Sequence, residues 1–241
     1  MDLIQDFKNL TIDKSTETQE NGYDDTQENI DSLYVLSVDI GVINLGITLS
    51  RIDSDFNFIE VVWLDLINIT EFSHKCVSKE NCKLQHTRTF SDWLDHVYQD
   101  NEKFFQEADF IIIEKQPPMG FVVVEQLIFN RYRHKSSLIN PKNVHTFLNM
   151  SSLDYDGRKA RSEKLAMQMI TEPDLCEQIT FYHRQHDICD SLCMLLYWLH
   201  KKREELKKQN IIDRVNKTQI GDININEWFD RMRYSSCSNE T

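Results

Sequence analysis

The sequence has no long hydrophobic run. Its longest clear apolar stretch, Leu192 to Leu199, is far shorter than the roughly 18 residues that a membrane-spanning helix needs. The six cysteines follow no regular spacing, and we expect no signal peptide and, because the N-terminal region is acidic, no transit peptide. These absences favour free thiols in a reducing compartment such as the cytoplasm.

Basic charge is also scarce. The chain has 27 Lys and Arg against 39 Asp and Glu, a net charge of −12. Residues 1–32 hold nine acidic residues and two lysines, which leaves a net charge of −5 for the rest. We expect this polar segment to be a disordered tail. Any binding of nucleic acid must therefore depend on local basic patches.

The most informative stretch extends from Tyr34 to Leu49. It begins with an apolar run rich in β-branched residues, which is typical of a buried strand, and a carboxylate, Asp39, stands near its end. Two further apolar runs, 45–52 and 58–66, follow after short turns. The three runs predict an antiparallel meander.

The rest of the domain alternates helical and strand-like patterns. Strand patterns occur at 108–114, 143–148 and 179–182, and helical periodicity at 90–105, 121–132, 157–170 and 186–208. The pattern predicts an α/β fold, a mixed sheet with helices on both faces, over residues 33–208. The polar segment 209–241 stays unassigned.

Four carboxylates are candidates for a metal site. Asp39 and Glu114 each stand at or near the end of an apolar strand, where a buried charge needs a partner. Asp187 and Asp190 share a face of the last helix, although favourable interaction with the helix dipole could also explain them. Clustered carboxylates can hold two Mg²⁺ or Mn²⁺ ions roughly 4 Å apart. Such ions activate a water and stabilise the leaving oxygen of a phosphodiester.

A second group of metal-ligating residue types lies between the meander and the first helix. It contains His74, Cys76, Cys82 and His86, with His96 a further candidate. The spacing differs from a standard zinc finger, but a structural Zn²⁺ is one interpretation. The other interpretation is that these cysteines and histidines are scattered and bind no metal.

Several short motifs resemble the RuvC-type Holliday junction resolvases, most closely the branch found in poxviruses and iridoviruses. The motifs cover about residues 34–205 in the order that the family has them, and the resemblance implies an RNase H-like fold with a five-stranded sheet. They are Asp-Ile-Gly at 39–41 with Asn44 and Gly46, Ile-Ile-Ile-Glu at 111–114, Glu-Lys-Gln-Pro-Pro at 114–118, Val-Glu-Gln-Leu-Ile at 124–128 and His-Asp-Ile-Cys-Asp-Ser at 186–191.

The resemblance implies a metal-dependent endonuclease that resolves four-way and other branched DNA by paired, symmetric nicks. Asp39, Glu114, Asp187 and Asp190 fall on the four metal-binding acids of the family, with Asp39 bridging two ions, and His186 could assist. The resemblance further implies a homodimer and, together with the free thiols, the cytoplasm of an infected cell, and the short apolar runs lead us to expect no membrane partner. The helix at 121–132 is the candidate dimer interface, with burial under a loop as the competing interpretation.

Basic residues would have to bind the DNA backbone. One candidate cluster includes Arg131, Arg133 and Lys135, with His134 and Lys142 nearby. A second cluster, favoured because it precedes the last helix, contains Arg158, Lys159, Arg161 and Lys164, and Lys115 is a further candidate. A solvated helix face is the alternative for each.

The loop after Glu114 departs from the family pattern. Bacterial members carry there an aromatic residue that inserts at the junction, whereas this loop has two prolines. Met119 and Phe121 are the candidate substitutes.

Three other functional classes are alternatives. The actin, Hsp70 and sugar-kinase ATPases also open with Asp-x-Gly, but they need a second glycine-rich phosphate loop, and none of the six glycines forms one after Gly46. An RNase H-like nuclease acting on RNA–DNA hybrids or a transposase-like nuclease stays open, because the superfamily shares the metal site. A catalytically inactive DNA-binding or assembly module is the third, and the presence of all four acids argues against it.

Overall fold

The computed structural model describes residues 32–41, 43–71 and 82–222, with side chains as far as residue 213. The expected acidic tail, 1–32, lies outside these residues except for Ser32. The chain divides into two compact units, residues 1–200 and 201–241. Within the described ranges, no helix is both long enough and apolar enough to cross a membrane.

The first unit is built on a five-stranded sheet with the strand order β3-β2-β1-β4-β5. Strand β1 pairs antiparallel with β2, and β2 pairs antiparallel with β3, whereas β4 runs parallel to β1 and to β5. This confirms the predicted mixed sheet with its N-terminal meander. The strands are β1 (Leu33–Ile40), β2 (Asn44–Ile52), β3 (Phe58–Asn68), β4 (Phe110–Glu114) and β5 (Ser136–Ile139).

Two of the predicted strands are wrong. Residues 143–148 belong mainly to helix α5 (Pro141–Phe147), which starts where the Asn140 side chain accepts a hydrogen bond from the Lys142 amide at 3.0 Å. Residues 179–182 cover the end of helix α7 (Pro173–Thr180) and the turn after it. In both cases a proline at the first helical position favours a helix start. The fifth strand of the sheet is instead the four-residue segment β5, which precedes α5.

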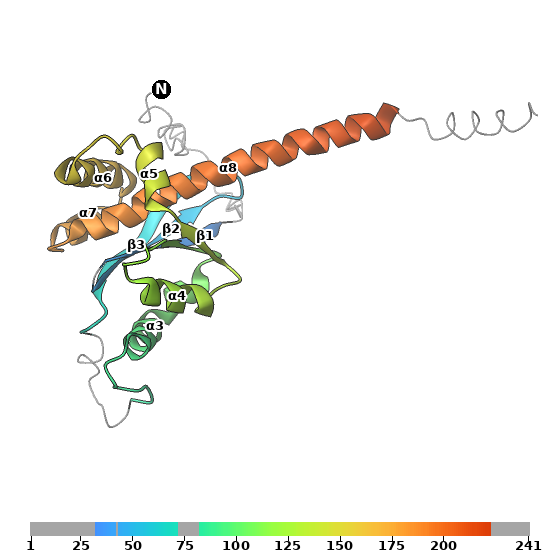
Figure 1. The fold of residues 1–241 in the computed structure, drawn as a ribbon. Helices are drawn as coiled ribbons and strands as arrows, with labels where there is room; N and C mark the ends of the chain where they lie inside the picture. The colour runs from blue at the N-terminus through green and yellow to red at the C-terminus, as the bar shows by residue number, and fades with distance from the viewer. Residues whose placement is uncertain (1–31, 42, 72–81, 223–241) are drawn as a thin grey trace, which may run out of the picture. The chain divides into compact units, whose positions relative to one another are not determined.

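Helices cover both faces of the sheet, as predicted (Figure 1). Helices α3 (Phe90–Glu107) and α4 (Val122–Arg131) pack against one face, with side chains such as Val97, Phe105 and Ile128 in a common buried cluster. Helix α6 (Tyr155–Met169), helices α5 and α7, and residues 185–200 of helix α8 (Gln185–Asp222) cover the other face.

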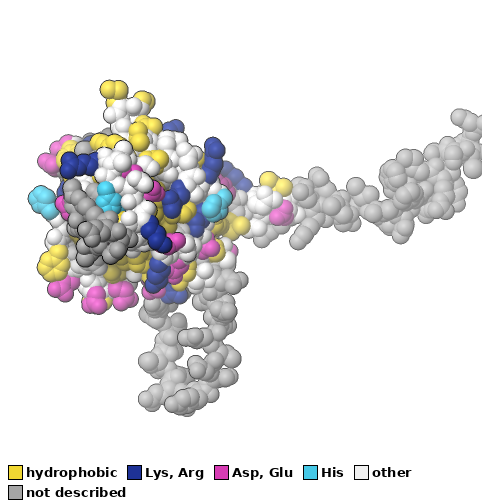
Figure 2. Space-filling model, turned by 90° about the horizontal axis from the view of Figure 1, so that it is seen from below, with side chains coloured by type: hydrophobic (Ala, Val, Ile, Leu, Met, Phe, Trp, Pro, Cys, Tyr) yellow, Lys and Arg dark blue, Asp and Glu magenta, His cyan; other side chains and the backbone are white. Residues whose placement is uncertain are grey.

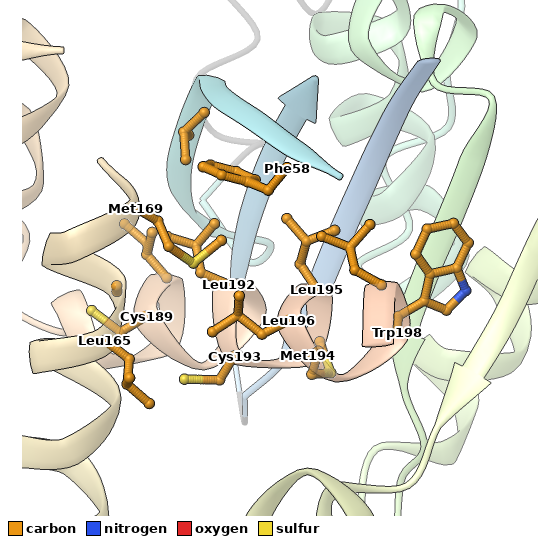
Figure 3. Close-up of a cluster of buried hydrophobic side chains, with 14 of the residues drawn as sticks. Phe58, Leu165, Met169, Cys189, Leu192, Cys193, Met194, Leu195, Leu196 and Trp198 are labelled. Atoms are coloured by element: carbon orange, nitrogen blue, oxygen red, sulfur yellow. The ribbon is translucent and has the colours of Figure 1, made fainter. Parts of the chain in front are cut away.

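The N-terminal half of α8 is anchored by apolar contacts. Figure 3 shows its side chains, among them Leu192 and Leu195, in one buried cluster with Phe58 of β3 and Met169 of α6. All four side chains are at most 1 % exposed. Each contributes roughly 1.5–3 kcal/mol by burial, so the first turns of α8 have a firmly determined place on the sheet.

The second unit contains the continuation of α8 from residue 201 to Asp222, beyond the predicted end at 208. Its described side chains form ion pairs one turn apart, with Lys202 3.0 Å from Glu205 and Lys207 3.0 Å from Glu204. The rest of the unassigned segment, 223–241, lies outside the described residues.

Candidate active site

Asp39 and Glu114 come from neighbouring strands. Strand β4 runs parallel to β1, with Ile113 opposite Val38 in the register, so the next residues, Glu114 and Asp39, emerge at the same edge of the sheet. A hydrogen bond joins the two carboxyl groups. The convergence expected from the sequence is therefore present for this pair.

Strand β2 brings the start of α8 to the same edge. Gly46 stands opposite Asp39 in the sheet, and its missing side chain leaves room for the helix backbone: a Cβ there would lie 2.7 Å from the Ile188 amide nitrogen and would overlap the Asp187 carbonyl. This close approach explains the glycine. Two residues further along β2, the buried Thr48 hydroxyl lies 3.0 Å from that of Ser191, a second link between β2 and α8.

Asp39, Glu114 and Asp190 line a pocket with a volume of about 210 Å³, and Arg158 and Lys159 stand at its wall. We call this site the carboxylate pocket. The remaining lining residues are Pro141, Val144, His145, Met150, Tyr155, Cys193 and Met194.

The fourth acid, Asp187, lies beside the pocket and is already paired. Arg184 donates to it through Nε, at 2.9 Å from Oδ2, and through Nη2, at 3.3 Å from Oδ1. His186 Nε2 lies 3.0 Å from the same Oδ1, and burial lowers the pKa of this histidine. Asp187 is therefore a buried carboxylate with a charge partner of its own.

The acids of the pocket lack such partners. Burial and the negative charges of Glu114, Asp190 and Asp187 raise the pKa of Asp39 well above its ordinary value. Burial raises the pKa of Glu114 to about 7 and that of Asp190 to about 6, against opposing hydrogen bonds from Gln116 and Ser162.

In the described part of the chain, no Lys or Arg forms an ion pair with Asp39, Glu114 or Asp190. Three partly buried carboxyl groups whose ionisation is opposed by desolvation and mutual repulsion need a cation to be charged together. Their hard oxygen atoms are ligands of the kind that Mg²⁺ and Mn²⁺ prefer. The residues present therefore fit a divalent metal ion.

Two residues that the sequence showed only as parts of motifs support Glu114. The Gln116 side chain donates to Glu114 Oε2 at 2.5 Å and to the Ile40 carbonyl at 3.2 Å, so it bridges the ends of β4 and β1. The backbone amide of Gln116 in turn donates to Glu125, a buried acid of α4, at 2.5 Å. One signal in the sequence pointed to Glu125, because it is an acid within the apolar helical pattern of residues 121–132.

The second basic cluster lies partly at the pocket. Arg158 and Lys159 line it, and Lys159 Nζ stands 4.5 Å from the centre of the Tyr155 ring. Arg161 is half-buried and Lys164 is exposed on the same helix, α6. The DNA-binding role of these residues stays a prediction.

The first basic cluster has other partners. Arg131 forms an ion pair with Asp95 of α3 at 3.1 Å. Lys135 donates to the carbonyl oxygens of Phe105 and Ala108, at 2.9 and 2.6 Å, and so binds the C-terminal end of α3. Figure 2, which views the molecule of Figure 1 from below, shows Lys and Arg side chains interspersed with Asp and Glu.

The remaining candidates lie in loops on the α3–α4 side. Lys115 is exposed and Met119 is 98 % exposed in the loop after Glu114. Phe121, at the end of that loop, packs against Phe90 with 6.2 Å between ring centres. Arg133 is exposed, and its guanidinium lies 5.8 Å from the centre of a neighbouring phenylalanine ring.

The predicted zinc ligands are only partly described. His74 and Cys76 lie outside the described residues. Cys82, His86 and His96 come together, with their ligand atoms all within 4.8 Å of one another. None of the three lines the carboxylate pocket.

Two solved structures with this fold are Holliday junction resolvases. The fowlpox virus resolvase in complex with its substrate junction DNA matches with a TM-score of 0.51 and 19 % identity, covering 70 % of this chain and 98 % of the viral one. The yeast mitochondrial resolvase Ydc2 matches with a TM-score of 0.55 and 14 % identity, covering 75 % and 85 %. At these identities the likeness shows the fold, which is RNase H-like as expected.

No curated protein sequence matches the chain significantly. The family model described as "Poxvirus A22 protein" matches residues 33–202, which include the whole sheet, all four candidate acids and the anchored half of α8. The chain therefore belongs to the poxvirus A22 protein family.

Proposed function

We propose that this chain is a divalent-metal-dependent endonuclease that resolves four-way DNA junctions. The observation that carries the proposal is the pocket in which Asp39, Glu114 and Asp190 meet from three separate elements, with Asp187 beside them. Family membership and the likeness to two junction resolvases, one of them in complex with a Holliday junction, support the choice of substrate.

The carboxylate pocket would hold two divalent ions, Mg²⁺ or Mn²⁺. Asp39 interacts electrostatically with Glu114, Asp190 and Asp187, and the four acids together would hold the ions. Bound divalent ions would activate the attacking water and neutralise charge on the leaving 3′ oxygen. Arg184 acts as a positioning residue, because its two hydrogen bonds hold Asp187 in one orientation.

Arg158 and Lys159 are suited to the DNA backbone. They stand at the wall of the same pocket as the acids, so a phosphate that enters the pocket meets positive charge on one side. Phosphate contacts of this kind release counterions, so binding should weaken steeply with salt. Arg161, Lys164 and Lys115 would extend the contact along the strand.

Paired, symmetric nicks require two active sites, and we propose a homodimer. Helix α4 buries Val124 and Ile128 against the sheet, whereas Val123 is 56 % exposed on its outer side. Exposed apolar residues on a helix are suited to a second copy. Light scattering of the purified chain tests the dimer, and Val123→Glu should shift it to monomers. The site of action would be the cytoplasm of an infected cell.

The experiment that tests the proposed function compares three substrates of the same base composition: a synthetic four-way junction, a linear duplex and an RNA–DNA hybrid. We expect paired nicks in the junction with Mg²⁺ and none with EDTA. Asp39→Asn should bind the junction without cutting it, because the substitution removes a ligand charge and leaves the basic wall intact.

Each other outcome counts against the proposal. Preferential cutting of the hybrid would indicate a nuclease of the RNase H type. Junction binding without cleavage by the wild-type chain at any divalent ion would indicate a binding or assembly module. Equal cutting by Asp39→Asn and wild type would place the active site elsewhere.

A further inference from the structure

A second cluster of metal-ligating side chains lies at the start of α3, and we call it the histidine–cysteine cluster: Cys82, His86 and His96. Cys82 and His86 belong to the segment before the helix and are partly buried, whereas His96 stands in the second turn of α3 and is 4 % exposed. The proposed nuclease activity uses none of them.

Two of the three distances between the ligand atoms match a tetrahedral zinc site, and the third pair, His86 and Cys82, lies within 4.8 Å. His96 Nε2 lies 3.2 Å from His86 Nε2 and 3.7 Å from Cys82 Sγ. Bonds of about 2.0–2.1 Å to nitrogen and about 2.3 Å to sulfur at tetrahedral angles put two nitrogens roughly 3.3 Å apart and nitrogen and sulfur roughly 3.6 Å apart. The observed separations therefore leave room for a Zn²⁺ ion between the three atoms.

His96 is oriented as a metal ligand. Its Nδ1 lies 2.6 Å from the Asp92 carbonyl oxygen, which can only accept a hydrogen bond. In the neutral ring Nδ1 therefore carries the hydrogen, and the lone pair of Nε2 faces His86 and Cys82. A zinc-bound histidine typically donates its other N–H to such an acceptor.

Asp92 also holds the segment that carries His86. Its carboxylate accepts hydrogen bonds from the amide of Thr87, at 2.6 Å, and from the Thr87 hydroxyl. The Thr89 hydroxyl caps the helix by accepting from the Asp92 amide at 3.3 Å. One residue thus orients His96 through its carbonyl and fixes the backbone next to His86 through its side chain.

We propose that Cys82, His86 and His96 bind one Zn²⁺ ion through a thiolate and two imidazoles. The ion ties the segment 82–89 to α3, and the fourth coordination position is left to a further donor or to water. Phe90, the first residue of that helix, contacts Phe121 in the loop after Glu114. Zinc binding would therefore stabilise the start of α3, on which Phe121 of the loop after Glu114 packs.

A contact without metal is the competing explanation. An N–H of His86 could donate to His96 Nε2, with the Cys82 thiol simply packed beside the rings, which lie 4.8 Å apart. The two explanations differ in what the purified chain contains. Only the metal site predicts a zinc ion bound through a deprotonated thiol.

The test measures zinc by mass spectrometry in the full chain, purified without an affinity tag and dialysed. We expect equimolar zinc in wild type and a large loss in Cys82→Ser and His86→Asn. Matched controls outside the cluster, Cys176→Ser and His134→Asn, should keep the metal. Asp39→Asn should keep it as well, which separates this site from the carboxylate pocket.

Cobalt gives a second readout that does not depend on variants that fold. Co²⁺ in place of zinc should show a thiolate-to-metal charge-transfer band and the strong visible bands of tetrahedral coordination. Wild-type chain without bound zinc and without these bands would overturn the proposal. So would zinc that persists unchanged in Cys82→Ser and His86→Asn.

Discussion

The carboxylate pocket and the histidine–cysteine cluster are assembled in opposite ways. The acids at 39, 114, 187 and 190 come from three segments that are far apart in the sequence, and they meet because β1, β4 and α8 end or begin at one edge of the sheet. Cys82, His86 and His96 lie within fifteen consecutive residues and meet through one helix start.

The two sites also differ in chemistry. The pocket offers only oxygen ligands and carries buried charge that raises the pKa values of Asp39, Glu114 and Asp190. The cluster offers nitrogen and sulfur. Hard oxygen ligands suit Mg²⁺ and Mn²⁺, which exchange with solution and serve a reaction, whereas imidazole and thiolate suit a retained Zn²⁺. One small domain would thus separate a catalytic metal from a structural one by ligand type.

The strongest test of this separation makes one substitution in each site and measures both cleavage and zinc content in each variant. Asp190→Asn should lower the single-turnover rate of junction cleavage at least about 100-fold, since even outer-shell changes at metal sites cost about 10–100-fold, and it should leave zinc content unchanged. His86→Asn should lose zinc and retain most of the cleavage rate well below its melting temperature. The comparison fails if both variants lose both properties while still folded.

Gly46→Ala tests whether the close approach of α8 to β2 positions the acids of α8 beside Asp39 and Glu114. A Cβ there meets the Asp187 backbone, so α8 must move away from β2. Overpacking of this kind typically costs about 1–3 kcal/mol of unfolding free energy, and we expect cleavage to fall well beyond what the stability loss explains. Thr48→Val, which only removes the hydrogen bond to Ser191, should have a much smaller effect on cleavage. Equal rates in Gly46→Ala and wild type would contradict the close approach.

Gln116→Ala tests the support of Glu114. Without the Gln116 amide, Glu114 loses a hydrogen bond that favours its charged form, so the metal should bind more weakly by about 10–100-fold. The Mg²⁺ dependence of cleavage should shift to higher concentration, with a near-normal rate at saturation. Gln106→Ala, which removes an exposed glutamine of α3 whose side chain donates to Glu102, serves as the matched control and should not shift it. A lowered rate at saturating Mg²⁺ would instead indicate a role in the reaction itself.

The smallest expected effect is the pH dependence of stability without metal. Because folding raises the pKa values of Asp39, Glu114 and Asp190, the folded chain binds more protons than the unfolded chain above about pH 4. Their contribution to stability therefore falls as the pH rises through the pKa values of Asp190, about 6, and Glu114, about 7.

Melting in EDTA should thus occur several degrees lower at pH 8 than at pH 6, by roughly 1.4 kcal/mol per pKa unit. Mg²⁺ should restore stability at pH 8 and have little effect at pH 5.5, where protons compete with it. Asp39→Asn should reduce the pH difference. An identical pH difference in wild type and Asp39→Asn would show that these acids do not cause it.

The sequence was sufficient for much of the fold. The β-branched runs at 34–40 and 45–52 and the apolar spacing of α3 and α8 each have a period that belongs to one structure, and these elements were predicted correctly. The two wrong strands lie where short apolar runs, 143–148 and 179–182, carry little periodicity. There the local signals, Asn140 before Pro141 and Glu172 before Pro173, indicate helix starts and outweigh β-propensity.

The acids were found because a carboxylate at the end of an apolar strand is unusual, and because the motifs resemble a known family. The partners of the acids could not be found in this way. Arg184 and Gln116 are ordinary polar residues in the sequence, and only the fold shows that one holds Asp187 and the other bridges Glu114 to the end of β1. Similarly, Arg131 and Lys135 looked like free cations, but their pairing with Asp95 and with the end of α3 depends on packing over long sequence distances.

The central claim is that the acids of the carboxylate pocket bind divalent ions together. The most direct measurement is a titration with Mn²⁺ at pH 8 of chain that has been freed of Mg²⁺ and Mn²⁺, in which electron paramagnetic resonance reports the free ion. Zinc is kept in the protein, so that the histidine–cysteine cluster takes no Mn²⁺. We predict that the wild-type chain binds Mn²⁺, that Mg²⁺ competes for it, and that Asp39→Asn abolishes most of the binding. Mn²⁺ binding of equal strength in wild type and in Asp39→Asn would contradict the account.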